Sequence, residues 1–191
     1  MNRLLGLSRL IDALNERIGR LLFWLVFLMT FISAGNAVAR YGFNLRSNAW
    51  LEIQWYLYSI VFLGAAGYTL KHNAHVRIDL VTGRLNRRAH AWIDIFGTLF
   101  FLLPMATLIL WLSWPIFMNA WTSNEISSNA GGLIRWPARA LVPAGFFLLT
   151  LQGVSELIKQ VAFLLGLIPD PLEKHADPAI EQMLVEQEAA K

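Results

Sequence analysis

The sequence predicts an all-α membrane protein with four transmembrane helices and both termini in the cytoplasm. Three observations support this fold class: an apolar composition, long runs without charged residues, and an uneven distribution of Lys and Arg. Of the 191 residues, 56% are hydrophobic and only 15% are charged, whereas soluble domains carry about 25% charged residues. The chain has no cysteine, which excludes disulfides, thiolate metal sites and cysteine nucleophiles.

Four segments are long and apolar enough to span a bilayer, at about residues 21–40, 50–70, 91–114 and 140–166. A spanning helix needs about 20 residues, and only helices and closed barrels satisfy their backbone groups in lipid. Because the apolar residues are continuous rather than alternating, each segment is predicted to be a helix. The first run is longer than the apolar core of a signal peptide, so we expect it to be retained.

Basic residues give the predicted orientation, because short loops rich in Lys and Arg stay in the cytoplasm. One side of the four-span arrangement carries twelve such residues: Arg3, Arg9, Arg17, Arg20, Lys71, Arg77, Arg84, Arg87, Arg88, Lys159, Lys174 and Lys191. The other side carries four: Arg40, Arg46, Arg135 and Arg139. The segments near 41–50 and 122–139 are therefore predicted to face outward.

The two ends of the chain differ from the spans. Residues 1–20 place Leu7, Leu10, Ile11, Leu14 and Ile18 at helical spacing, which predicts an amphipathic helix lying in the inner membrane interface. A simple extension of the first span is the alternative interpretation. Residues 169–191 are predicted to form an acidic cytoplasmic tail. Residues 1–168 then form a single transmembrane domain.

Chemistry-bearing residues avoid the middle of the spans. The stretch KHNAHVRIDL at 71–80 has two of the four histidines, but all four lie outside the spans and lack the partners that zinc or haem needs. Charged residues near the spans lie within a turn or two of a predicted boundary. A transporter places polar groups or broken helices near the midplane. We therefore predict no enzyme activity, cofactor, metal or nucleic-acid site, and no transport by this chain alone; the basic inner loop is expected to contact lipid headgroups.

The second predicted span and the loop after it contain a distinctive string, NAWLEIQWYLYSIVFLGAAGYTLKHNAHVRIDLV. Trp50 and Glu52 open the helix, Phe62–Ala66 reads FLGAA, and Lys71 precedes the HVRID run of His75–Asp79. This string resembles the small membrane subunit of tripartite ATP-independent periplasmic transporters, the DctQ-like family. Two further segments are similar to the family, Asn36–Phe43 and Ser127–Gly153. The resemblance covers about residues 20–165.

The resemblance implies a division of labour among three proteins in the bacterial inner membrane and periplasm. A large subunit would carry the organic-acid substrate and sodium, and a soluble periplasmic protein would capture the substrate. This chain would be a non-catalytic scaffold that packs on the large subunit and helps the binding protein to dock. Sodium is expected to bind in the large subunit.

Two groups of residues are predicted to make these contacts. The large-subunit surface is predicted to include Trp50, Glu52, Gly64, Ala65, Ala66, Gly67, His75, Arg77 and Asp79. The GAAG run at 64–67 allows close helix approach, either to that partner or within this chain. Docking of the binding protein is predicted to involve Arg46, Glu125, Arg135, Trp136 and Arg139.

Two other functions remain open from the residues alone. One is a membrane anchor subunit of a respiratory oxidoreductase, which would bind haem or a quinone. The other is a self-sufficient small channel or exporter, which would need a polar pore lining that the spans do not offer. The substrate of a transporter complex is not encoded here, because its specificity would reside in other chains.

Overall fold

The computed structural model describes residues 1–45, 47–74 and 86–170. Its helices are α1 (Asn2–Gly42), α2 (Asn48–Lys71), α3 (Arg87–Gly97), α4 (Leu103–Thr122) and α5 (Trp136–Leu164). A five-residue π-helical turn, η2 (Thr98–Leu102), joins α3 to α4, so that Arg87–Thr122 runs as one helix. Within the described residues, the only β pairing is an isolated antiparallel bridge between Ile126 and Ile134. The all-helical prediction is therefore confirmed.

Helix α1 is continuous where the sequence predicts two elements. Its 41 residues correspond to a length of about 60 Å at the usual rise per residue, about twice the thickness of a bilayer core. Residues 1–20 thus extend the first span, as the alternative interpretation had it, and do not form a separate helix. Gly19 falls at the expected junction, but it serves close packing: a Cβ there would lie 2.2 Å from Cδ2 of Tyr68.

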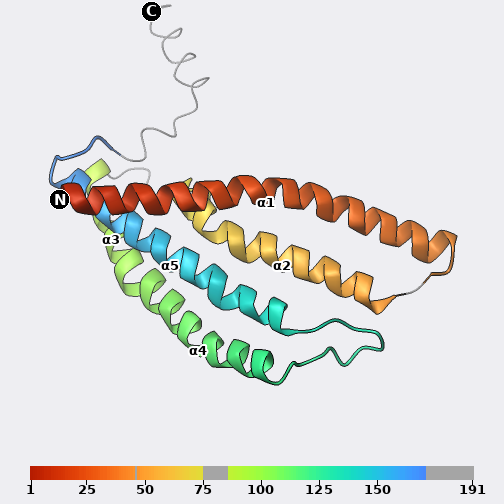
Figure 1. The fold of residues 1–191 in the computed structure, drawn as a ribbon. Helices are drawn as coiled ribbons and strands as arrows, with labels where there is room; N and C mark the ends of the chain where they lie inside the picture. The colour runs from red at the N-terminus through yellow and green to blue at the C-terminus, as the bar shows by residue number, and fades with distance from the viewer. Residues whose placement is uncertain (46, 75–85, 171–191) are drawn as a thin grey trace, which may run out of the picture.

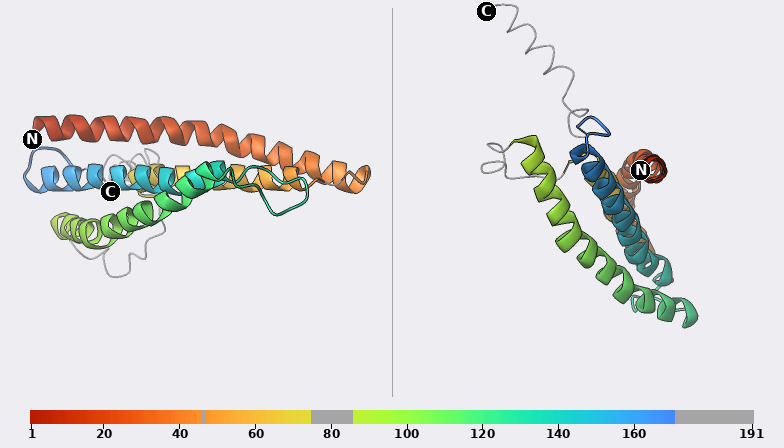
Figure 2. Two further views of the ribbon diagram at one scale, coloured as in Figure 1. Left: turned by 60° about the horizontal axis from the view of Figure 1, so that its bottom comes forward. Right: turned by 90° about the vertical axis from the view of Figure 1, so that its left-hand side faces the viewer.

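The turn η2 has a local cause in Pro104. Proline has no N–H to donate, and its ring collides with the carbonyl four residues earlier in a regular α-helix. The backbone N–H of Leu103 instead reaches the carbonyl of Thr98, five residues back, which widens the turn just ahead of the proline. The sequence predicts a bend at Pro104, and the α3–α4 helix curves along its length (Figure 2).

The four long helices lie side by side, with α1 and the α3–α4 helix at the two edges and α2 and α5 between them (Figures 1 and 2). Helix α5 packs against all three others. Small residues allow this: a Cβ on Gly145 would lie 2.7 Å from Cβ of Leu63, and one on Gly153 would lie 2.8 Å from Cδ2 of Leu102. Glycine at such positions permits close helix approach.

The connections gather at opposite ends of this layer (Figure 1). Residues 43–47 and 123–135 lie together at one end, here called the loop end. The N-terminus, the end of α2 and the end of α5 lie at the other, here called the N-terminal end. This arrangement agrees with the predicted alternation of the segments across a membrane.

Three helical stretches are long and apolar enough to cross a membrane: Arg3–Gly42, Arg87–Thr122 and Trp136–Leu164. The most apolar window of α5 is 28% buried, compared with 6% for each of the other two. Large apolar side chains therefore cover much of the outer surface, which is unfavourable in water and favourable in lipid. Helix α2 is not among the three, since Gln54 and several Trp and Tyr residues lower its hydropathy. The fourth span remains a prediction.

Candidate partner-binding surfaces

At the loop end, Glu52 holds the segment that connects α4 to α5. Its Oε1 accepts hydrogen bonds from the hydroxyl of Ser127 and from Nδ2 of Asn129, the latter at 2.9 Å. Its Oε2 accepts the backbone N–H of Leu133 at 2.7 Å. We call these four residues the Glu52 cluster. Because Glu52 is only 4% exposed, its carboxylate is engaged within its own chain rather than presented to another subunit.

The stem of the same segment contains the predicted docking residues. Oε1 of Glu125 accepts from Arg139 at 2.6 Å and from Arg135 at 3.2 Å. The ring of Trp136 lies edge-on against Trp121, with a centroid distance of 4.3 Å. The structure thus brings four of the five predicted docking residues together. The fifth, Arg46, lies outside the described residues.

The GAAG run packs mainly within this chain. A Cβ on Gly64 would lie 3.1 Å from Cδ1 of Leu22, and one on Gly67 would lie 2.2 Å from Oδ1 of Asn15. These two glycines therefore permit the approach of α1 to α2. The carbonyls of Ala65 and Ala66 both accept from the hydroxyl of Thr69. The sequence left two interpretations of this run open, and for the glycines the internal one is correct.

Ala66 also lines an apolar groove of about 640 Å³ that runs between α2 and the α3–α4 helix. The groove has α5 as its floor, through Phe146 and Leu149, and Gly97 and Ala106 on the opposite wall. The small side chains along these walls leave room for a further helix.

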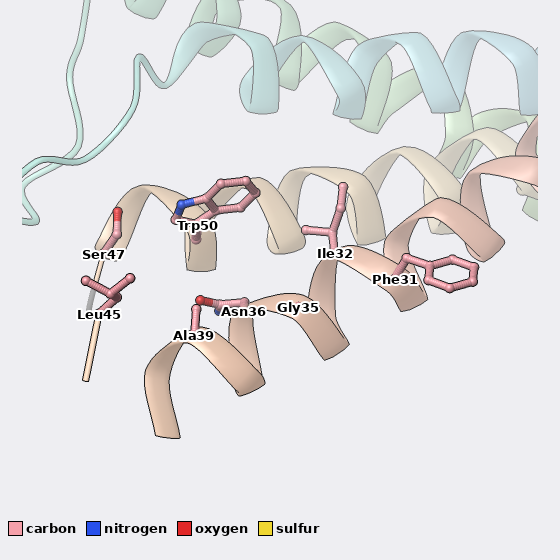
Figure 3. Close-up of a pocket in the computed structure, with 8 residues that line it drawn as sticks. All are labelled: Phe31, Ile32, Gly35, Asn36, Ala39, Leu45, Ser47 and Trp50. Atoms are coloured by element: carbon pink, nitrogen blue, oxygen red, sulfur yellow. The ribbon is translucent and has the colours of Figure 1, made fainter. Parts of the chain in front are cut away.

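A second apolar groove, of about 670 Å³, lies near the loop end between α1 and the start of α2. Figure 3 shows its lining residues, with Trp50 from α2 and Ile32 and Asn36 from α1 directed toward the space between the helices. Trp50 is half exposed there. This position is compatible with the predicted contact between Trp50 and a partner.

At the N-terminal end, α1 and α5 are joined by a polar cluster that the sequence did not predict. Ser8 and Ser155 share a hydrogen bond of 2.7 Å, and Nδ2 of Asn15 donates to Gln152 at 2.9 Å. Lys159 pairs with Glu156 at 2.6 Å, as the sequence predicts, and also with Asp12 at 3.2 Å. The members of this α1–α5 cluster are Ser8, Asp12, Asn15, Gln152, Ser155, Glu156 and Lys159.

The start of the KHNAHVRIDL stretch joins the same end of the molecule. Oε2 of Glu16 lies 2.7 Å from Nζ of Lys71 and 2.8 Å from Nε2 of His72. His72 therefore has an acidic partner from α1. The predicted partner residues His75, Arg77 and Asp79 lie outside the described residues. Within the described part of the chain, no group of three or more His, Cys, Asp or Glu side chains is arranged to hold a metal ion.

Apolar helices with lipid-compatible outer faces and polar clusters at their two ends define a helical membrane protein. Residues 26–163 match the sequence model for the DctQ component of tripartite ATP-independent periplasmic (TRAP) transporters. This match covers more than two-thirds of the chain, and the chain belongs to the DctQ family. The family is a transporter component, so the match gives no support to the oxidoreductase-anchor alternative. Comparisons with curated proteins and with solved structures give no match.

Proposed function

We propose that the chain is the scaffold subunit of a sodium-coupled importer of organic acids that depends on a periplasmic binding protein, and that it resides in the bacterial inner membrane. The observation that carries this proposal is the family match over residues 26–163. In this role the chain catalyses no reaction and binds no cofactor. It packs on the large permease subunit, which carries substrate and sodium.

The distribution of charge supports a scaffold rather than a carrier. Residues 21–39, 53–70, 95–124 and 140–155 contain no acidic or basic side chain. The charged clusters instead lie at the two ends of the helices. An ion or organic acid crossing a bilayer needs polar groups or interrupted helices near the midplane. The transport step is therefore assigned to the large subunit.

The groove between α2 and the α3–α4 helix is the proposed seat of a helix from the large subunit. It exposes Ala66 of the family string alongside Gly97 and Ala106. Close contact between backbones is a main source of helix association in lipid. Trp50, in the groove near the loop end, is proposed to supply a second contact. Glu52, Gly64 and Gly67 are used within this chain and are left out of that surface.

The loop end is proposed to receive the periplasmic binding protein. Its connecting segment is fixed by the Glu52 cluster and by the pairs of Glu125 with Arg135 and Arg139. A segment already held in one conformation loses little entropy on docking. This assignment places the loop end in the periplasm, as the distribution of Lys and Arg predicts.

Reconstitution tests the proposal. Proteoliposomes are prepared with this chain alone, with the large permease subunit alone, and with both. Uptake of a labelled organic acid is measured with an inward sodium gradient, with and without the binding protein. We expect uptake only with both subunits, the binding protein and sodium. Uptake by this chain alone, or equal uptake by the large subunit without it, would contradict the proposal.

A further inference from the structure

The Glu52 cluster is one part of a longer contact along one face of α2. Asn48, Glu52 and Tyr56 are spaced four residues apart and so lie on the same side of the helix. Nδ2 of Asn48 donates to the carbonyl of Ala130 at 3.0 Å, and the hydroxyl of Tyr56 donates to the carbonyl of Ile134 at 3.1 Å. Successive turns of α2 therefore bind the connecting segment at residues 127–134.

Glu52 contributes most to this contact. It accepts three hydrogen bonds, from two side chains and one backbone amide, all from residues 75 to 81 positions further along the chain. Gly132 leaves the space that the carboxylate occupies, because a Cβ there would lie 2.9 Å from Oε1 of Glu52 and 2.5 Å from Cβ of Ser127. A buried carboxylate costs free energy to desolvate and needs correctly placed donors. It thus favours a single arrangement of the segment.

This arrangement presents an apolar pair. Ile126 and Ile134 form the isolated β-bridge, and they are 64% and 48% exposed. The bridge is reinforced by backbone hydrogen bonds from Ser127 to Leu133 at 2.9 Å and from Arg135 to Glu125 at 2.8 Å. Two exposed isoleucines side by side on a fixed loop are unfavourable in water, unless another surface covers them.

We propose that Glu52 is a positioning residue, which holds the Ile126–Ile134 pair in the orientation against which the soluble binding protein docks. The inference rests on the proposed function. It assigns Glu52 to the docking of the binding protein and not to the contact with the large subunit. The basic side chains of Arg135 and Arg139 beside the pair are held by Glu125, so the pair itself is the exposed apolar feature of this loop.

The test uses the complete transporter in proteoliposomes, with the binding protein titrated outside. Glu52→Gln keeps the size of the side chain, but its amide nitrogen cannot accept, so at least one of the three hydrogen bonds is lost. We expect the binding-protein concentration for half-maximal uptake to rise about tenfold, the equivalent of one charge-assisted hydrogen bond. Maximal uptake and co-purification with the large subunit should be unchanged. Tyr56→Phe removes one neutral hydrogen bond and should give a rise of about two- to fivefold.

Two further variants separate positioning from general stability. Ile126→Ser with Ile134→Ser keeps the Glu52 cluster and removes the apolar pair, so it should raise the half-maximal concentration at least as much. Combining it with Glu52→Gln should add little, because both changes act on one contact. Glu16→Gln, the same substitution at the N-terminal end, should leave the half-maximal concentration unchanged.

Three results would overturn the inference. These are full additivity of the combined variants, an unchanged half-maximal concentration in Glu52→Gln, and loss of the large subunit from the purified Glu52→Gln complex. A Ser–Ser variant that loses attachment to lipid, but still responds normally to binding protein, would assign the pair to the membrane surface instead. Failure of the proposed function is distinguishable, since the wild-type complex would then show no uptake dependent on the binding protein.

Discussion

At the loop end one helix holds an irregular segment, whereas at the N-terminal end two helices hold each other. The Glu52 cluster sets one carboxylate against neutral donors from a loop. The α1–α5 cluster sets two acids, Asp12 and Glu156, against the single cation of Lys159, with hydroxyl and amide groups around them. The first arrangement fixes a surface for contact, and the second fixes the position of a helix that is longer than a bilayer is thick.

This difference predicts different responses to substitution. Changes in the α1–α5 cluster and the packed glycines should lower the stability of the helical layer. Changes at the loop end should leave that stability nearly intact and alter docking instead. Chemical unfolding of the purified chain in detergent, followed by circular dichroism, measures the first kind of effect.

The largest loss of stability is expected for Lys159→Met. This change leaves the carboxylates of Asp12 and Glu156 close together and mostly buried without their cation, which should cost about 3 kcal/mol. Lys159→Arg keeps the charge and should cost less than about 1 kcal/mol. If both variants unfold like the wild type, the α1–α5 cluster does not hold α1 in place.

A smaller loss is expected for Gly67→Ala. The added Cβ would lie 2.2 Å from Oδ1 of Asn15 and 3.3 Å from the carbonyl oxygen of Leu148, so α1 or α5 must shift, at a cost of about 2 kcal/mol. Gly6→Ala is the matched control, because a Cβ there meets no atom within 4 Å. The control should be neutral, or more stable by up to about 1 kcal/mol from helix propensity. Equal stability of the two variants would contradict the packing of α1 on α2 and α5.

The smallest effect is expected for Glu125→Gln at the loop end. Its partners Arg135 and Arg139 are partly exposed, with 45% and 33% of their side-chain surfaces accessible, and such pairs contribute about 0.5 kcal/mol. The unfolding midpoint should therefore stay close to that of the wild type. A loss above about 2 kcal/mol would show that the loop end also stabilises the helical layer.

The sequence predicts the helices well and their neighbours poorly. Uncharged runs locate the four long helices to within a few residues, because the length of a membrane helix is set by bilayer thickness. The continuity of α1 is harder to predict, since an amphipathic segment before a span has the same pattern whether it bends or continues. Only the packing of Gly19 against Tyr68 favours continuation.

The two clusters differ in how visible they are in the sequence. Ser8, Asp12 and Asn15 recur at helical spacing on α1, as Gln152, Ser155 and Lys159 do on α5. These two polar stripes could have suggested a pair of matching helix faces. The partners of Glu52 lie in an irregular loop more than 70 residues away, and no local pattern specifies such a contact. Its burial against its own loop could therefore only be found in the structure.

The π-helical turn has a consequence for the whole α3–α4 helix. Small buried residues recur every seven positions on α4, at Ala106, Ser113 and Ala120. Continued without interruption, this register would place Leu99 and Trp92 toward α5. The wider turn takes up one additional residue, so that Ala91 is buried instead and the bulky indole of Trp92 remains 64% exposed. A single-residue deletion within Thr98–Leu102 would rotate α3 by about 100° and bring that indole against α5, a phase error along the helix rather than a lost contact.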